Sequence, residues 1–582
     1  MSGGIGLLLS IAKDALAAQQ YGIYVTGHNI ANVNTPGYSK QSAVLEARHP
    51  APLGGLVLGR GVNTTEITRN CDQIIENRVM QGKSDLYSFK GMENYMVALE
   101  GLFNENTDNS LSNILGDFWN RWHDIANNPS AVPERIALYE HSKLLSEQLN
   151  SFDVDLEQLR TDLTNALDAG VGRVNEITSE IASLNTEIIV MGVDASANDL
   201  KDQRNVLCSE LAEYIDMKVF QQEHDSFTIV SANGVVFVDG DTSYDLELDG
   251  TSVKWQGSGG NEVDITDHIS KGKLGGFLEM RDEVVAKYKQ DLTELASEFI
   301  WAVNEQHSKG AGLTTFSSAT GTYSSSSPGS AVSTSASGLD YYDKVSTGTF
   351  RVYVYDSTGA LANAANVTVT AGATTLSNIA TAISAVDPDI TATVNGSGQL
   401  AISTTNSHTF AFSDDTSGAL AALGINTFFT GSTAGGIDIN STIASDKDYI
   451  AAAQIDSTTG SFATGDNTNA QAIADLQYSS MQISEWTYDR VNGNTEGTTT
   501  ATIDDYYHSL IGSLGIKASS IKRSSSFSEN MVHELETMRD SISSVSLDEE
   551  MTQLMQYQHA YSAAAKLFSV ADEMMQTLLA QK

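Results

Sequence analysis

Two stretches at opposite ends of the chain carry apolar residues at alternating spacings of three and four, which is the pattern of a coiled-coil seam. In the N-terminal stretch the seam consists of Ile5, Leu9, Ala12, Leu16, Ile23 and Ile30. Near the other end it consists of Leu554, Tyr557, Tyr561, Ala564, Phe568, Ala571, Met575 and Leu578. A coiled-coil seam requires a second helix, so we expect the two terminal segments to pack against each other.

The N-terminal helix is expected to end in a sharp turn. Pro36 disfavours the helical region for Thr35, and Gly37 permits a positive φ. His28 lies shortly before this turn, and we expect it to hydrogen-bond at the exit of the helix rather than to bind a ligand. The N-terminal segment therefore contains two parts in series, a helix for pairing and a turn that leads the chain away from it.

The residues around this turn resemble a known signature. Asn-Ile-Ala-Asn at 29–32, followed by Asn-Thr-Pro-Gly-Tyr-Ser at 34–39, is similar to the N-terminal motif of the bacterial flagellar axial family, which comprises rod, hook and hook-associated proteins. Leu-Asp-Glu-Glu at 547–550 is similar to the C-terminal segment of the same family. The signature residues are Asn29, Asn32, Asn34, Thr35, Pro36, Gly37 and Tyr38. The resemblance covers both ends of the chain strongly and the middle weakly.

The resemblance implies a structural subunit and not an enzyme. A hook-associated protein would form part of the junction between hook and filament and would be needed for filament assembly. Its expected partners are further copies of itself, the hook protein, the second hook-filament junction protein and an export chaperone at the C-terminal helix. The family also implies export through the flagellar type III pathway without a cleaved signal peptide, and a final location outside the cell on the flagellum.

The C-terminal segment carries more apolar side chains than one partner helix can cover. Met551, Met555, Leu567, Met574 and Leu579 lie off the seam. Because two isolated helices leave their outer faces exposed, these residues indicate contacts with further chains. We therefore expect the seam residues of both termini to form the assembly interface of a ring or helical zone of many copies.

Composition excludes several classes of partner. The 582 residues include 73 acidic and 33 basic ones, and a formal net charge of −40 does not attract nucleic acid or anionic lipid. No stretch is apolar over the roughly 20 residues that a membrane span requires. Only Cys71 and Cys208 are present, so neither a disulfide framework nor a zinc site is expected. No basic residue precedes the short apolar run that begins at Ile5, which favours an uncleaved helix over a signal peptide.

The periodicity predicts an elongated α+β fold with three domains. Residues 1–55 and 545–582 are assigned to a terminal coiled-coil domain, residues 56–335 and 445–544 to a mainly α-helical domain, and residues 336–444 to an outer β-rich domain. This count agrees with a length prior of roughly 150 residues for each domain.

Several elements are expected within these domains. Helices are predicted over 70–102, 110–127, 133–191, 274–307 and 518–579, a small β-element over 217–266, and a hairpin around Gly54-Gly55. The long helix over 133–191 is expected to break near Gly170, because two glycines there each cost about 1 kcal/mol relative to alanine. The Ser-, Thr- and Gly-rich stretch 310–338 is typical of a linker, and helices are expected to resume after Asp446.

No catalytic, cofactor-binding or metal-binding residues are predicted. Ser10 and Lys13 match a Ser-x-x-Lys motif, but they lie on the coiled-coil helix, and no companion motif of that enzyme class is present. His533-Glu534 opens a zinc-protease phrase, but Thr537 stands where the second histidine ligand is required. These matches are better explained by chance than by chemistry.

Two alternatives stay open. The first is a hook or rod protein, against which the long helix 133–191 and the Asn-x-Asn-Thr-Pro-Gly-Tyr form of the signature argue. The second is a secreted enzyme with its active site in the insert 340–444, where His408 is the only histidine and no nucleophile-base pair is visible.

Overall fold

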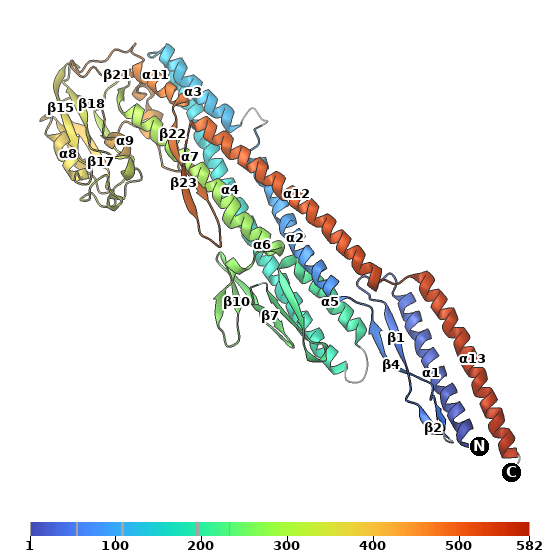
Figure 1. Ribbon diagram of the computed structural model, residues 1–582. Helices are drawn as coiled ribbons and strands as arrows, with labels where there is room; N and C mark the ends of the chain where they lie inside the picture. Colours follow the sequence, from blue (N-terminus) through green and yellow to red (C-terminus); the bar gives the residue numbers. More distant parts are fainter. Residues whose placement is uncertain (1, 54–55, 106–109, 192–196, 232, 581–582) are drawn as a thin grey trace. The chain divides into compact units, whose positions relative to one another are not determined.

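The computed structural model describes residues 2–53, 56–105, 110–191, 197–231 and 233–580. The chain folds into two compact units, and several long helices contribute to both (Figure 1). Unit 1 comprises Met1–Asn94, Leu163–Glu279 and Ser519–Lys582, and unit 2 comprises Tyr95–Asp162 and Met280–Ala518. Helices and strands occur together, as the predicted α+β class requires. None of the described helices combines the length and apolar character that crossing a membrane demands.

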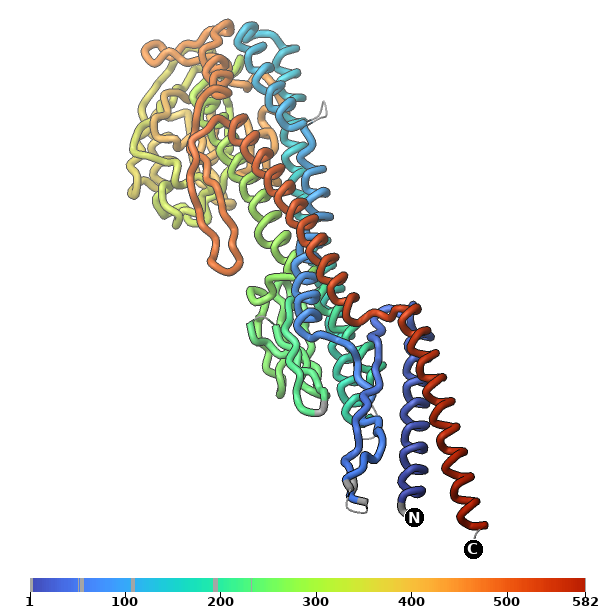
Figure 2. The backbone as a smooth tube through the Cα atoms, turned by 45° about the vertical axis from the view of Figure 1, so that its right-hand side comes forward, coloured from blue at the N-terminus to red at the C-terminus, as the bar shows by residue number. Residues whose placement is uncertain are grey.

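In unit 1 the two terminal helices lie side by side, as Figures 1 and 2 both show. A second face of the N-terminal helix packs on a two-stranded antiparallel ribbon, and a short hairpin connects the two strands of that ribbon. The elements are α1 (Ser2–Ala31), α13 (Leu547–Ala580), the ribbon strands β1 (Gln41–Ala47) and β4 (Val62–Arg69), and the hairpin strands β2 (Ala51–Leu53) and β3 (Leu56–Leu58). The predicted pairing of the termini and the predicted hairpin are confirmed, although Gly54-Gly55 lies outside the described residues.

Long helices form most of the remainder of unit 1. They are α2 (Gln73–Leu102), α4 (Val132–Met191), α5 (Asn198–Tyr214), α6 (Gly272–Glu279) and α12 (Ile503–Ser543), of which α2, α4 and α12 continue into unit 2. α2 and α4 agree closely with the predicted helices, whereas α5 was not predicted. The side chain of Ile74 in the first turn of α2 is 68 % exposed, and the buried face of the helix begins at Val79.

The predicted break near Gly170 is also wrong, because α4 runs without interruption from Val132 to Met191. A Cβ atom at Gly170 would lie 2.6 Å from Cδ2 of Leu274, so the glycine lets α6 approach α4 closely. Leu274 is fully buried in the core that α4, α5 and the β-element share. This burial offsets the helix-propensity cost of the glycine, which is about 1 kcal/mol.

The β-element predicted over 217–266 is present as two small antiparallel sheets. Their strands are β5 (Met217–Gln221), β6 (Phe227–Ser231), β7 (Val236–Asp239) and β8 (Thr242–Ser243) in one sheet, and β9 (Leu246–Asp249), β10 (Ser252–Gln256) and β11 (Glu262–Asp264) in the other. Ile229, Phe237 and Val253 are buried and face the same core as α4 and α5, and in β6 the buried Phe227, Ile229 and Ser231 alternate with the partly buried Thr228 and Val230. The period of two in the sequence reflects this one-sided burial.

Unit 2 is built around an aromatic core between helices. The helices are α3 (Leu111–Asn127), α7 (Ala286–Ser308), α9 (Ala419–Ala422), α10 (Ser441–Ser445) and α11 (Thr468–Ala474), together with the unit 2 parts of α2, α4 and α12. Phe118, Trp119 and Phe299 contact one another edge to face within this core. The helix predicted over 274–307 is present, but Met280–Val285 between α6 and α7 is π-helical, which apolar spacing did not indicate.

A hairpin in unit 2 was not predicted. Its strands, β22 (Met481–Thr487) and β23 (Thr495–Ala501), lie where helices were expected to have resumed. The indole Nε1 of Trp486 donates a hydrogen bond over 3.3 Å to Oε1 of Glu294, and the Trp486 backbone N–H donates to Oδ1 of Asp291 over 3.3 Å. These contacts hold the hairpin on α7, so its position depends on tertiary contacts and not on local sequence.

The β-rich insert contains two three-stranded antiparallel sheets, with orders β15-β14-β18 and β13-β17-β16. The strands are β13 (Ser318–Thr320), β14 (Gly348–Tyr355), β15 (Leu361–Val369), β16 (Ile390–Val394), β17 (Leu400–Thr404) and β18 (Thr409–Ser413), and shorter pairs are formed by β12 (Gly310–Ala311) with β21 (Ala453–Gln454) and by β19 (Phe429–Thr430) with β20 (Asp438–Ile439). The predicted helix is present as α8 (Leu376–Ser384), which packs against β16 and β15.

The prediction that 310–338 is a linker is wrong, because this stretch is part of the packed insert. β13 pairs with β17, and Phe316, Tyr323 and Val332 are buried. Its small polar residues serve packing, since Ser325 Oγ donates to the Ser337 carbonyl over 2.7 Å in a buried hydrogen bond. Composition alone cannot distinguish such internally bonded serines from a flexible linker.

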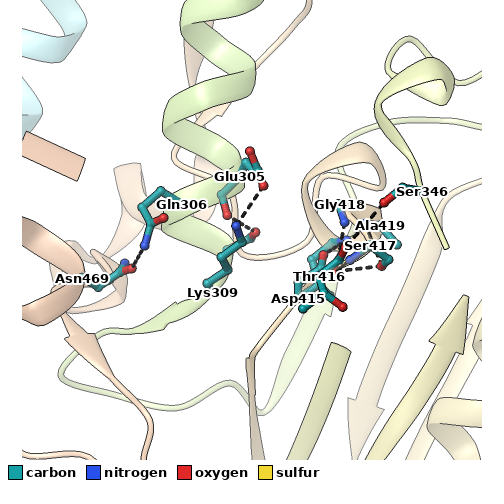
Figure 3. A network of polar contacts seen from close by, with 12 residues as sticks. Glu305, Gln306, Lys309, Ser346, Asp415, Thr416, Ser417, Gly418, Ala419 and Asn469 are labelled. Carbon is teal, nitrogen blue, oxygen red and sulfur yellow. Dashed lines mark hydrogen bonds and ion pairs between the residues drawn. The ribbon is translucent and has the colours of Figure 1, made fainter. Parts of the chain in front are cut away.

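Polar contacts fix the loops near the end of α7 (Figure 3). The side chain of Gln306 donates to Oδ1 of Asn469 over 2.8 Å. The carboxylate of Asp415 accepts hydrogen bonds from the backbone N–H groups of Ser417, Gly418 and Leu420. Asp415 thereby satisfies donors at the start of α9, which would otherwise be buried without partners.

Candidate assembly site

Small residues are buried in the contact between α1 and α13, and three of them, Ala12, Ala564 and Ala571, belong to the predicted seam. The most buried apolar side chains on the two helices are Ile5, Ala12, Ala18, Val25, Ala564 and Ala571. Of the predicted seam residues, Leu9, Leu16, Ile23, Ile30, Leu554, Tyr557 and Met575 are half-buried, whereas Tyr561, Phe568 and Leu578 are exposed. The helices thus approach through alanines, and the larger side chains lie at the edges of the contact.

One glycine allows a close approach of the two helices. A Cβ atom at Gly22 of α1 would lie 2.6 Å from Cε1 of Tyr557 on α13. The tyrosine ring therefore lies directly on the backbone of α1, in a space that any other residue would fill. The apolar spacing placed Tyr557 on the seam, but it gave no indication that Gly22 was its partner.

α13 carries many large apolar side chains that α1 leaves exposed. The exposed large apolar side chains of this helix are Leu547, Met551, Met555, Tyr561, Leu567, Phe568, Val570, Met574, Leu578 and Leu579. Part of this face borders a mainly apolar groove of about 700 Å³ between Ile5 and Leu8 of α1 and Met574 and Leu578 of α13. Such a continuous apolar surface is typical of a protein interface.

Asn29 joins three segments at the end of α1. Its side-chain amide donates to the Gln41 carbonyl over 2.9 Å and to Oε2 of Glu550 over 3.0 Å. Its oxygen accepts hydrogen bonds from the Tyr38 hydroxyl over 2.7 Å and from the Gln41 N–H over 3.0 Å. All four hydrogen-bonding positions of this buried amide are therefore occupied, and Asn29 links α1, β1 and the first turn of α13.

The Tyr38 hydroxyl and His28 complete this network. Because the Tyr38 hydroxyl donates to Asn29, it accepts the contact of 3.0 Å from Nδ1 of His28, which fixes the Nδ1–H tautomer. Burial raises the pKa of Tyr38, and the nearby carboxylates of Asp199, Asp202 and Glu550 raise it further. The phenol therefore stays neutral, and the predicted hydrogen-bonding role of His28 is confirmed.

Lys40 braces the junction between α12 and α13. Its backbone N–H donates to the carbonyl of Ser543, the last residue of α12, over 2.8 Å. Its ammonium group lies 3.1 Å from Oε2 of Glu549 and 3.1 Å from Oε1 of Glu550. Burial lowers the pKa of Lys40, but hydrogen bonds to the two glutamates outweigh this effect and raise it overall. We refer to Asn29, Tyr38, Lys40, Gln41 and Glu550 as the clasp.

Sequence reasoning identified only part of the clasp. It singled out Asn29 and Tyr38, whereas Lys40, Gln41 and Glu550 were not assigned a role. Lys40 and Gln41 follow the signature directly, and Glu550 lies in the Leu-Asp-Glu-Glu segment that marked the start of the last helix. The sequence feature that could have indicated this contact is the opposite charge of Lys40 near one end of the chain and of Glu549 and Glu550 near the other.

The predicted turn is present after α1. The backbone N–H of Thr35 donates to the Asn32 carbonyl, and that of Tyr38 donates to the Thr35 carbonyl. Gly37 has a φ of +78°, and a Cβ atom there would lie 2.2 Å from Cγ2 of Val206. Glycine is thus required both by the backbone conformation and by the approach of α5. Asn34, Thr35 and Pro36 are exposed, and Asn32 is half-buried.

α5 holds the far side of the turn. Oδ2 of Asp202 accepts a hydrogen bond from the Ser39 N–H over 3.0 Å, and its Oδ1 accepts from Arg69 over 2.8 Å. Oδ1 of Asp199 accepts from the Gln41 side chain over 2.8 Å. A groove of about 660 Å³ remains between the turn, α4 and α5, and we call it the signature groove. It is lined by His28, Asn32, Thr35, Pro36, Gly37, Tyr38, Glu180, Ser183, Leu184, Asp199, Asp202, Gln203, Val206 and Leu207.

One group of side chains in the insert has the residue types of metal ligands. Atoms of Asp387, Asp389 and His408 lie within 4.8 Å of one another. Asp387 accepts hydrogen bonds from Asn363 and from the Asp389 N–H, and Oδ1 of Asp389 accepts from Asn406 over 2.7 Å. The carboxylates are thus already engaged by neighbouring turns, and this geometry supports a structural role for the group.

Family models match three segments of the chain. Residues 96–321 match the description "Flagellar hook-associated protein FlgK helical domain". Residues 9–38 match "Flagella basal body rod protein", and residues 539–581 match "Flagellar basal body rod FlgEFG protein C-terminal". The N-terminal match includes the signature turn up to Tyr38. The C-terminal match includes the junction between α12 and α13, and α13 itself.

Relatives match the chain over almost its whole length. Flagellar hook-associated protein 1 of Salmonella typhimurium is 27 % identical and that of Bacillus subtilis 26 %, over 98 % of this chain and 99 % and 97 % of the relatives. The flagellar hook junction protein FlgK from Burkholderia pseudomallei has a similar fold, with a TM-score of 0.52 and 16 % identity over 80 % of this chain and 100 % of that chain. Together with the signature turn and the paired termini, these matches show that the chain is similar over almost its whole length to flagellar hook-associated protein 1.

Proposed function

We propose that the chain is a structural subunit of the bacterial flagellum that forms the junction between hook and filament and is needed for filament assembly. The observation that carries this proposal is the apolar face of α13, which extends from Leu547 to Leu579 and is left uncovered by α1. A helix with one partner and so much exposed apolar surface is suited to contacts with further copies. The similarity of the chain to flagellar hook-associated protein 1 supplies the setting in which such contacts serve assembly.

Assembly in this proposal proceeds by repeated contacts between unlike faces of neighbouring copies. The paired α1 and α13 form the axial part, and copies arranged around a common axis cover the exposed side of α13. Contacts of this kind generate rings or helical zones, depending on whether the rotation closes. The hook protein and the second junction protein are the proposed neighbours at the two ends of the zone.

The exposed face of α13 also gives a physical reason for a chaperone. Before assembly, Phe568 and the methionines of this helix are open to non-specific association. We assign the proposed export chaperone to this helix, and we place the assembled chain outside the cell after export without a cleaved signal peptide.

The domain roles follow the same scheme as a proposal. Residues 1–55 and 545–582 would carry assembly, residues 56–335 and 445–544 would form the helical domain, and residues 336–444 would form the outer β-rich domain. Both compact units contain parts of the proposed helical domain, because α2, α4 and α12 contribute to each unit.

Replacing Tyr561 and Phe568 with Asp tests the proposal. These side chains are 40 % and 42 % exposed, so the variant should fold and remain soluble. Two charges on the apolar face should prevent burial against a neighbouring copy. The expected result is a folded chain that is absent from isolated flagella, in cells that make hooks but few filaments.

A matched control carries the same charge at two positions of α13 that are already polar. Gln558 and Ser569 are exposed on α13, and replacing both with Asp adds the same two negative charges. This control should assemble normally and restore motility in cells that lack the wild-type chain. Normal filaments from the Tyr561 and Phe568 variant would contradict the proposal.

A further inference from the structure

The hairpin formed by β2 and β3 is a small exposed arm with a distinct chemistry. Val57 is 71 % exposed and Leu58 is also exposed, and Arg60 lies two residues beyond Leu58, after the end of β3. Nη1 of Arg48, at the start of the arm, lies 3.3 Å from Oδ2 of Asp14 and forms an ion pair with it. Arg60, by contrast, makes no ion pair with any residue that the structure describes. We call residues 48–53 and 56–60 the arm. Its exposed side consists of two apolar side chains followed by one cation.

The signature groove has the complementary chemistry. Leu184, Val206 and Leu207 provide apolar surface, and Glu180 and Asp199 add exposed carboxylates. The groove is lined by no lysine or arginine. Its volume of about 660 Å³ is sufficient for several side chains. An apolar pair followed by a cation therefore matches the groove in size, in apolar character and in charge.

The arm cannot reach the groove of its own chain. The ribbon between them is a regular ladder that begins with Gln41 opposite Arg69 and ends with Ala47 opposite Val62. Seven residues at about 3.3 Å each separate its two ends by roughly 20 Å. The groove adjoins the first end, where Gln41 contacts Asp199, and the arm extends from the other end.

We infer that the arm of one copy docks in the signature groove of a second copy, with Val57 and Leu58 on the apolar surface and Arg60 beside Glu180. This inference rests on the proposed function, in which copies associate. The contact between the two copies is heterologous, because the arm and the groove are different surfaces at opposite ends of one ribbon. Successive copies then join head to tail along the ribbon.

The overall charge of the chain supports an arm of this kind. At a formal net charge of −40, copies repel one another, and contacts between them depend on local pairs of opposite charge. Arg60 and His49 are exposed basic groups on the arm, whereas the groove presents only acidic groups as charged residues apart from His28. Charge complementarity thus favours the arm of a second copy, rather than an acidic partner, as the occupant of the signature groove.

A cysteine pair tests the inference directly. In a chain that carries Cys71→Ser, Val57→Cys is combined with Ser183→Cys, and flagella isolated from cells are oxidised and run on non-reducing gels. Both positions are exposed, so folding should be unaffected, and Cys208 is buried. The expected result is a ladder of disulfide-linked copies. The matched control combines Val57→Cys with Lys218→Cys, which is exposed on β5 outside the groove, and should give no ladder.

A charge swap provides a second readout that does not depend on oxidation. Arg60→Glu or Glu180→Arg alone should reduce the incorporation of the chain into flagella, by about two- to five-fold per contact, the range for an exposed ion pair. The double variant should recover incorporation, while the melting temperature of the purified chain stays unchanged in all three. A ladder of disulfide-linked copies, together with recovered incorporation of the double charge-swap variant into flagella, supports the inference.

The outcomes separate this inference from the proposed function. If the cysteine variant is present in flagella but gives no ladder, the docking of the arm is wrong and the structural role of the chain stands. If the charge swap gives no recovery, the pairing of Arg60 with Glu180 is overturned in the same way. If the wild-type chain itself is absent from flagella, the proposed function fails.

Discussion

The side-chain amide of Asn29 donates a hydrogen bond to the carboxylate of Glu550 over 3.0 Å and so joins residues 521 positions apart. Glu550 is 0 % exposed, and Asn29 is 1 % exposed. A carboxylate without contact to water depends on its partners, because an unpaired buried charge is strongly unfavourable. The clasp therefore sets the position of α13 against α1 through a few short polar contacts, and its components can be tested one by one.

Replacing Asn29 with Ala should loosen the terminal helices. The substitution removes one partner of Glu550, two partners of the Gln41 backbone and the acceptor of the Tyr38 hydroxyl, and each buried polar group left unsatisfied costs about 1–3 kcal/mol. Hydrogen exchange of the purified chain should show faster exchange of the α13 amides, with little change in the insert. Asn34→Ala is the control, because this exposed residue of the same signature belongs to no contact of the clasp. Equal exchange in both variants would show that the clasp does not hold α13.

Gly37→Ala should destabilise the turn for two separate reasons. The φ of +78° disfavours alanine by roughly 1–2 kcal/mol, and the new methyl group collides with Val206. Adding Val206→Ala should restore only the part of the melting temperature that is due to the collision. Gly27→Ala is the control, since no atom lies within 4 Å of a Cβ there and the residue is helical, so stability should stay equal or rise.

Gly22→Ala should separate the paired termini. Alanine favours the helix, but its Cβ atom would lie 2.6 Å from the Tyr557 ring, so the ring must move. Limited proteolysis should cut α13 faster than in the wild type, and Tyr557→Leu in the same chain should slow the cleavage again. Gly6→Ala on the same helix has open space around its Cβ position and should leave the cleavage rate unchanged.

His307 should make the stability of unit 2 depend on pH. It is fully buried, with Nδ1 at 2.8 Å from the Asn426 carbonyl and Nε2 accepting from the Ala451 N–H over 2.9 Å. Burial lowers its pKa to about 4, from an ordinary value of 6.5. Between these values the unfolded chain binds a proton that the folded chain does not, so stability falls as pH drops from 6.5 toward 4, by on the order of 3 kcal/mol.

The test compares melting temperatures of the wild type and His307→Gln at pH 7 and pH 4.5. Glutamine can donate and accept in place of the imidazole, and it does not titrate. The variant should be less stable at pH 7, and the difference should narrow at pH 4.5. His559→Gln, exposed on α13, should leave both melting temperatures unchanged. A constant difference at the two pH values would assign the pH dependence to other groups.

Periodicity was sufficient to predict the main elements but not their closest contacts. The three-four spacing found α1 and α13, because repeated burial on one side of a helix leaves a clear pattern. It placed Tyr561, Ala564, Phe568 and Ala571 in the seam, and of these four only the two alanines are buried. Small residues carry little weight in an apolar pattern, although they decide how closely two helices approach.

The errors in the insert have a different cause. The stretch around Ser325 and Ser337 has the composition of a linker, but its hydroxyl groups bond to backbone within a packed structure. The hairpin that contains Trp486 depends on Asp291 and Glu294, which lie far away in the sequence. In both cases the deciding partners are distant, and no local pattern indicates them.

The burial of Glu550 also bears on the order in which the chain can mature during synthesis. Asn29 and Lys40 leave the ribosome early, whereas the carboxylate that they surround is made more than five hundred residues later. Until then, the N-terminal turn lacks the group that fixes it, and contacts so distant in sequence form slowly. The clasp therefore distinguishes a full-length chain from an incomplete one, since a product that stops before Glu550 cannot close it.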